Sequence, residues 1–144
     1  MATHVLVPVD GSPAARKALK YAIEQLSDGT LTLLYVMDPM IEFSRQQAYP
    51  GFRLDDEFKN EREKGQHVLE SLLETVPDGM SVETELEAGR PAETIVRYAD
   101  DHDVDQIVIG SHGKRGVARF LLGSVAETIV RRSVVPVTVV RPTA

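Results

Sequence analysis

The residues best suited to bind a ligand lie in a glycine-rich loop. Glycines stand at Gly110, Gly113 and Gly123, and Lys114 and Arg115 add positive charge among them. Because glycine has no Cβ, it can take positive φ and let backbone N–H groups approach phosphate oxygens. The pattern indicates an anion-binding loop; ordinary turn glycines beside a solvated basic face are the alternative.

The segments on either side of this loop are those that a phosphate site requires. The apolar run 107–109 predicts a buried strand, and residues 124–132 predict a helix. Ser124 stands three residues before Glu127, which is the spacing of a capping box at a helix start. A helix N-terminus attracts anions through its unpaired amides and its dipole. Neither GxxxxGK(S/T) nor GxGxxG occurs, which excludes a Walker P-loop and a dinucleotide fingerprint.

A second polar cluster follows the first predicted strand. Residues 5–9 are apolar, as expected of a central strand, and Asp10-Gly11-Ser12-Pro13 ends them. Ser12 suits a helix N-cap, and Pro13 suits the first helical position. From the sequence alone, Asp10 is predicted to cap the corner between strand and helix.

Strands and helices alternate along the rest of the chain. Further strands are predicted at 31–36, 82–88 and 134–140, and further helices at about 13–26, at about 55–76 and from 91. The helix at 55–76 should bury Leu69, Leu72 and Leu73, among others. The alternation predicts an α/β fold with one open, doubly wound parallel sheet of five strands and helices on both faces. Such sheets bind ligands beyond the carboxyl ends of the strands, where strand order reverses, so we expect Asp10 and Gly110 to face each other.

Two strands are expected at the margins of this sheet. Residues 82–88 alternate with period two, so one side meets water or the strand lies at an edge, which the alternating glutamates would guard. Pro136 cannot donate a ladder hydrogen bond, which points to an edge position for the last strand. An uncovered apolar edge strand is prone to aggregation. We therefore expect the Val135–Val140 segment to pair with its copy in a two-fold homodimer, or else to be covered by the chain's own loops. Residues 38–54 form a long loop, predicted as a lid or binding loop or as plain surface.

Composition narrows the class of protein. The 144 residues suit one domain, 1–144, and 16 basic against 22 acidic residues give a net charge of −6. This balance argues against nucleic acid or an anionic membrane as a partner, because both require a basic surface. There is no cysteine, which excludes disulfides and thiolate chemistry. No signal peptide and no apolar run long enough to cross a bilayer are visible, so a cytoplasmic location is expected.

Taken together, these residues resemble the ATP-binding branch of the universal stress protein family. The shared segments are Val-Pro-Val-Asp-Gly-Ser at 7–12, Gly-Arg-Pro-Ala at 89–92, Ser-Val-Val-Pro-Val at 133–137, and Gly-x2-Gly-x9-Gly-Ser/Thr at 110–124. The resemblance covers essentially the whole chain. It implies an adenine nucleotide alpha hydrolase-like sheet of order 3-2-1-4-5, dimerised through the last strand.

The resemblance also implies roles for individual residues. Pro8, Val9 and Asp10 would lie at the adenine and ribose, and the backbone of Val36 would contact the base. The residues expected around the ribose and phosphates are Gly110, His112, Gly113, Gly123, Ser124 and Val125, and the expected cofactor site also includes Ser12, Lys114 and Arg115. His112 would donate to a phosphate, unless it is simply exposed. Mg²⁺ would be held mainly by phosphates and water, because no carboxylate cluster suggests a dedicated site.

Three functions are compatible with the sequence. We predict an ATP-binding regulatory homodimer of the stress response. The alternatives are a nucleotide-independent interaction module and a slow ATP-hydrolysing enzyme. Dedicated catalysis is not expected, because no general base or nucleophile stands out and the sequence offers no convincing third residue to complete a triad with Ser124 and His112. ATP-consuming ligases of related fold carry Ser-Gly-Gly-x-Asp-Ser after the first strand, where this chain has Asp10-Gly11-Ser12-Pro13.

Overall fold

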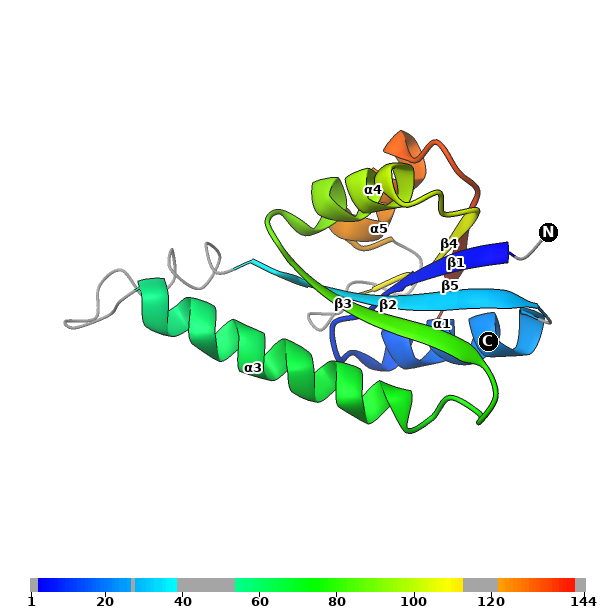
Figure 1. Cartoon of the computed structure of the whole chain (residues 1–144). Coiled ribbons are helices and arrows are strands. Elements are labelled where there is room, and N and C mark those ends of the chain that lie inside the picture. Colours follow the sequence, from blue (N-terminus) through cyan, green and yellow to red (C-terminus); the bar gives the residue numbers. More distant parts are fainter. Residues whose placement is uncertain (1–2, 27, 39–53, 113–121, 142–144) are drawn as a thin grey trace.

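A computed structural model describes residues 3–26, 28–38, 54–112 and 122–141. Its centre is a parallel sheet in the order β3-β2-β1-β4-β5 (Figure 1). The strands are β1 (Thr3–Pro8), β2 (Gly29–Met37), β3 (Ser81–Ala88), β4 (Gln106–Gly110) and β5 (Val137–Val140). The predicted fold class and the implied strand order are confirmed. Strand order reverses between β1 and β4.

Helices cover both faces of the sheet. They are α1 (Pro13–Gln25), α3 (Leu54–Leu73), α4 (Pro91–Asp101) and α5 (Ser124–Arg132). Figure 1 shows α1 and α3 on one face, with α4 and α5 on the other. Because side chains alternate along a strand, Leu31 and Leu33 pack toward the first pair, and Leu34 packs toward the second. None of the helices described is both long and apolar enough to span a bilayer.

The C-terminal end of α3 differs from that predicted. Leu69 and Leu72 are buried as expected, but Leu73 is 38% exposed. The helix ends at Leu73. Glu74 N–H still bonds four residues back, to Glu70 O at 3.4 Å, but Thr75 N–H bonds to Leu72 O at 3.0 Å and Val76 N–H to Leu73 O at 3.1 Å, only three residues back. This tighter turn leads out of the helix before Pro77.

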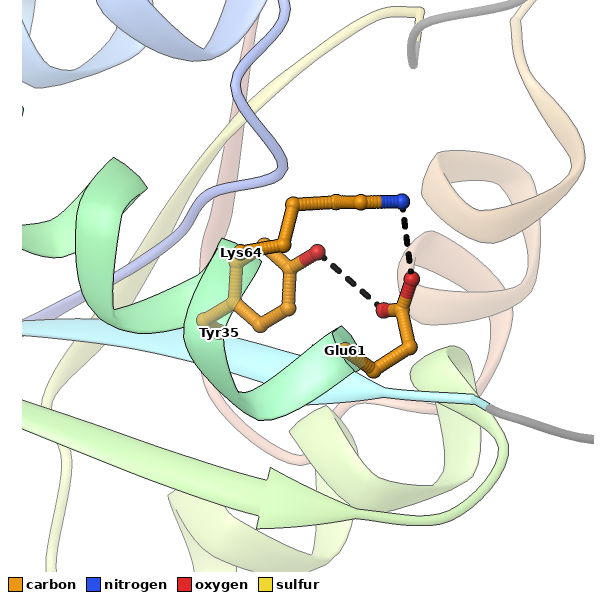
Figure 2. Close-up of polar contacts among 3 residues, drawn as sticks. All are labelled: Tyr35, Glu61 and Lys64. Carbon is orange, nitrogen blue, oxygen red and sulfur yellow. Dashed lines mark hydrogen bonds and ion pairs between the residues drawn. The ribbon is translucent and has the colours of Figure 1, made fainter. Parts of the chain in front are cut away.

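A buried polar contact fixes α3 to the sheet. The Tyr35 hydroxyl on β2 donates to Glu61 Oε2 at 3.2 Å, and Lys64 Nζ donates to Glu61 Oε1 at 3.2 Å (Figure 2). A Cβ at Gly65 would come within 2.6 Å of the Tyr35 ring, so the helix can approach the ring only with glycine there. Burial raises the pKa of the Tyr35 hydroxyl above its usual 10.0, and the nearby charges of Glu61 and Asp10 raise it further.

This contact predicts a loss of stability in alkali. A tyrosine whose pKa is raised by folding contributes stability that is complete below the unfolded pKa near 10.0 and declines as pH rises through the folded pKa. The free energy of unfolding should therefore fall above pH 10, with up to about 1.4 kcal/mol per pH unit due to Tyr35. Urea unfolding of Tyr35→Phe between pH 9 and 11 should show a shallower slope than the parent protein. Tyr21→Phe, at an exposed phenol, is the control; equal slopes for Tyr35→Phe and the parent would contradict the account.

The last strand occupies a sheet edge, as predicted, but it is shorter than expected. It begins at Val137, and Val134 is 74% exposed. Pro136 lies just before the strand, where its carbonyl accepts the Ile107 N–H at 2.9 Å. The proline therefore faces β4, not the open side. The edge position of β5 follows from the strand order, and the missing N–H of Pro136 does not cause it.

Candidate functional site

The candidate site lies where β1 and β4 separate. Val9 N–H donates to Leu34 O at 2.9 Å, so Val9 and Val7 face β2, and by alternation Leu6 and Pro8 face β4. The register of β1 with β4 stops at the pair Leu6–Ile107. The next rung would require an N–H on Pro8, which proline lacks. Pro8 thus ends the ladder at the point where strand order reverses.

A tight turn follows β1. Asp10 Oδ1 accepts the Ser12 N–H at 2.9 Å, and Ser12 Oγ accepts the Ala15 N–H at 3.1 Å. Gly11 has φ +83°, the left-handed region in which glycine is favoured. Ser12 is the N-cap of α1, as predicted, and Asp10 has the corner-capping role that was one of its two predicted roles. The turn holds the Asp10 carboxylate at the carboxyl end of β1.

The backbone of Val36 also faces the carboxyl end of β1. Met37 O accepts the Gly89 N–H at 2.9 Å, so Met37 faces β3, and alternation turns Val36 toward β1. The register of β1 with β2 ends at Pro8–Leu34, two residues before Val36. The amide and carbonyl of Val36 therefore lie beyond the β1 ladder. A planar base with one donor and one acceptor matches such a pair of groups.

Gly110 is required for close packing and not, as expected from the sequence, for a positive φ. Its φ is not positive, and that of Gly123 is −65°; the described glycines with positive φ are Gly11, Gly29, Gly79 and Gly89. A Cβ at Gly110 would lie 2.7 Å from Ala14 C and 2.9 Å from Ala14 O. The absence of a side chain at this position lets the first turn of α1 lie against the end of β4.

Ser111 joins the end of β4 to the start of α5. It is 1% exposed, and its N–H donates to Val140 O at 2.9 Å. Its carbonyl accepts the Gly123 N–H at 2.7 Å, and its Oγ lies 2.7 Å from His112 Nδ1. These bonds fix β5, α5 and the His112 ring relative to β4.

The predicted capping box at the start of α5 is wrong. The N-cap is Gly123, with φ −65° and ψ 157°, and Ser124 is the first helical residue. Glu127 does not reach back; its carboxylate pairs with Arg131 at 2.7 Å. Because glycine has no side chain, no side-chain cap satisfies the amides of the first turn. The positive end of the α5 dipole and these unbonded amides therefore lie beside Ser111, an arrangement that attracts an anion.

The structure thus brings most of the predicted site residues to one end of the sheet. These are Pro8, Val9, Asp10, Ser12, Val36, Gly110, His112, Gly123, Ser124 and Val125. Gly113, Lys114 and Arg115 lie outside the described residues, as does most of the 38–54 loop. Within the described ranges, no three His, Asp or Glu side chains form a group that could hold a metal ion.

Three residues that matter here were not singled out from the sequence. Ser111 stands directly after an apolar strand, and this place is the sequence signal for its role. Tyr35 lies beside Val36, and its partner Glu61 is 26 residues away along the chain. A tyrosine inside an apolar strand was the only sequence sign that a polar partner would be needed.

Comparison with known proteins assigns the chain to a family. A family model described as the universal stress protein family matches residues 1–141. The chain belongs to the universal stress protein family. Universal stress protein MJ0531 of Methanocaldococcus jannaschii is 34% identical over 140 residues, covering 95% of this chain and 81% of that one. MJ0577 of the same organism is 34% identical over 152 residues, covering 95% and 93%.

Solved structures of universal stress proteins share the fold. The structure of MJ0577 superposes with a TM-score of 0.81, covering 98% of this chain and 96% of that one. A universal stress protein in complex with cAMP gives a TM-score of 0.65 at 22% identity, covering 99% and 98%. A member from Arabidopsis thaliana with AMP bound gives 0.70 at 21% identity, covering 99% and 93%. At these identities the last two support the fold alone.

Proposed function

We propose that this universal stress protein binds an adenine nucleotide, ATP with Mg²⁺, at the switch point between β1 and β4. The observation that carries the proposal is the 2.7 Å bond from Gly123 N–H to Ser111 O. It holds the start of α5, which lacks a side-chain cap, against the end of β4. Phosphates are the ligand class best matched to such a helix start beside a strand end.

The other residues supply the remaining parts of a nucleotide site. The Val36 backbone would contact the base, with Pro8 and Val9 beside it, and Asp10 would accept a ribose hydroxyl. Gly110, His112, Gly123, Ser124 and Val125 would surround the phosphates, with Ser12 opposite them. Gly113, Lys114 and Arg115 are included on the motif alone. Mg²⁺ would be bound by phosphate oxygens and water.

The expected affinity is consistent with a regulatory ligand. Charge-assisted hydrogen bonds contribute roughly 1.5–3 kcal/mol each. Four or five of them, less the cost of association, reach the roughly 8 kcal/mol that corresponds to a micromolar dissociation constant. The AMP and cAMP complexes of proteins with this fold agree with an adenine nucleotide as the ligand class.

Calorimetry with ATP and Mg²⁺ tests the proposal. We expect saturable binding at one site per chain. Absence of binding up to millimolar ATP would favour the nucleotide-independent interaction module instead. ATP turnover well above one per minute that Ser124→Ala removes would favour the hydrolysing enzyme.

We also infer a cytoplasmic homodimer that pairs β5 with its copy. Pro136 and Val140 direct their carbonyls to β4, so alternation turns the backbone groups of Val137 and Val139 outward. In the described part of the chain, β5 pairs only with β4. An apolar edge with outward donors and acceptors is suited to two-fold pairing.

Val139→Pro should convert this dimer into a monomer. The substitution removes an outward N–H and leaves the β4 ladder intact, because that ladder uses Thr138 and Val140. Sedimentation equilibrium at micromolar concentration should give a dimer for the parent protein and for the Val139→Ala control, and a monomer for Val139→Pro. A monomeric parent protein would refute pairing through β5.

A further inference from the structure

The opposite edge of the sheet carries an unpaired strand. β3 pairs with β2 from Ser81 to Ala88 and with no other described strand. Gly89 N–H donates to Met37 O, so Gly89 and the odd-numbered residues before it face β2. Alternation then turns the backbone groups of Val82, Thr84 and Leu86 away from the sheet. Such a row of donors and acceptors is a template for one more strand.

A hollow lies beside this edge. Its volume is about 290 Å³, and it is lined from α3 and β3 by Gln66, Leu69, Glu70, Leu73, Thr84, Glu85 and Leu86. Leu73, which the prediction placed in the core, is 38% exposed. Thr84 and Leu86 both line the hollow and present outward backbone groups. A strand added to β3 would therefore run along the hollow and could place a side chain in it.

The wall of the hollow is held in place before any partner binds. The bond from Tyr35 to Glu61 and the close approach at Gly65 fix α3 to β2 from the buried side (Figure 2). Leu69 and Leu72 anchor the same helix in the core. A preformed wall lowers the ordering cost of binding.

The negative charge of this surface favours a basic partner over a second copy of the chain. Glu70 lines the hollow from α3, and Glu83, Glu85 and Glu87 alternate along β3. Because Val82 and Leu86 pack on the α3 side, the carboxylates of these three glutamates lie on the α4 side of the edge, where their charges act on Tyr98. A second copy pairing β3 with β3 would bring these rows of like charge together, which is unfavourable. Lysine or arginine on the incoming segment would meet opposite charge.

From these observations we propose that the β3 edge and α3 form a docking surface for an extended, basic segment of a partner protein. The segment adds a strand to β3, places one leucine-sized side chain against Leu73 and Leu86 on the α3 side, and sets basic side chains near Glu83 and Glu85 on the α4 side. This surface lies at the opposite edge of the sheet from β5 and does not use the switch point between β1 and β4. The inference stands whether or not nucleotide binds.

Thr84→Pro tests the proposal sharply. It removes an outward N–H that the β2 ladder does not use, and proline is tolerated at such an edge position. The probe is an end-capped peptide, Ser-Lys-Leu-Lys-Val-Lys-Thr-Ser, titrated into the ¹⁵N-labelled full chain. We expect amide shifts at Thr84, Leu86 and Leu73, weaker affinity in high salt, and a dissociation constant raised roughly 5- to 10-fold by Thr84→Pro.

Two controls complete the experiment. Thr84→Ala keeps the N–H and should change the dissociation constant by less than about twofold, and the same peptide with glutamate for lysine should not bind. Equal binding by Thr84→Pro and Thr84→Ala would overturn the proposal, as would shifts confined to other surfaces or equal binding of the acidic peptide. Self-association of the parent protein that Thr84→Pro abolishes would assign the edge to a second copy instead.

Discussion

Ser124→Pro should weaken the binding of ATP with Mg²⁺ by roughly 10- to 150-fold and leave α5 folded. The substitution removes one first-turn amide and the adjacent hydroxyl, and a charge-assisted hydrogen bond contributes about 1.5–3 kcal/mol. Proline suits the first helical position, since its φ is already helical. The preceding Gly123, with ψ 157°, has the extended conformation that a residue before proline prefers.

Ser124→Ala is the matched control for this prediction. It removes the hydroxyl and keeps the amide, so it separates the two groups. We expect Ser124→Ala to lose less affinity than Ser124→Pro in the same calorimetric titration, with far-ultraviolet circular dichroism unchanged in both. Unaltered affinity in Ser124→Pro would mean that the start of α5 does not bind the phosphates.

Gly110→Ala should destabilise the protein by about 1–3 kcal/mol in the absence of any ligand. The new Cβ would lie 2.7 to 2.9 Å from three atoms of Ala14, two of them backbone. A backbone contact in the first turn of α1 cannot be relieved by a side-chain rotation, so strand and helix must separate. Urea unfolding measures the loss directly.

A double-mutant cycle with Ala14→Gly shows whether this contact is the cause. Ala14→Gly removes the Ala14 Cβ, one of the three contacting atoms, and should reduce the penalty of Gly110→Ala without abolishing it. Strict additivity would contradict the packing role. If Gly110→Ala left stability unchanged but abolished nucleotide binding, the original reason for the glycine, close approach of a phosphate, would be restored.

The fold could be predicted because its signals are local and periodic. Apolar runs marked β1, β2 and β4, and the period-two pattern of residues 82–88 marked β3 as a strand with one wet side or at an edge, of which the structure shows the edge. The end of α3 was missed because the tightened turn at Thr75 and Val76 depends on hydrogen bonds that the apolar spacing does not reveal. Leu73 kept the helical spacing of a core residue but lies on the rim.

The sequence could predict that the site residues gather at the carboxyl ends of β1, β2 and β4, but not the contacts that each of them makes. A glycine in a sequence shows that something approaches closely, but not what; at Gly110 it is Ala14. Ser124 and Glu127 fit a capping box by spacing, yet the same spacing fits the first and fourth helical positions, which they occupy. The bond between Ser111 and Gly123 joins two residues on either side of a loop, so no local pattern could show it.

An NMR titration of the ¹⁵N-labelled chain with ATP and Mg²⁺ shows whether the nucleotide binds at the start of α5 and the ends of β2 and β4. We expect saturable shifts at the amides of Ser124, Val125 and Val36, together with that of Ser111 at the end of β4. If nucleotide binding shifted other resonances but not those of these four amides, or if no resonance shifted at millimolar nucleotide, binding at this site would be contradicted.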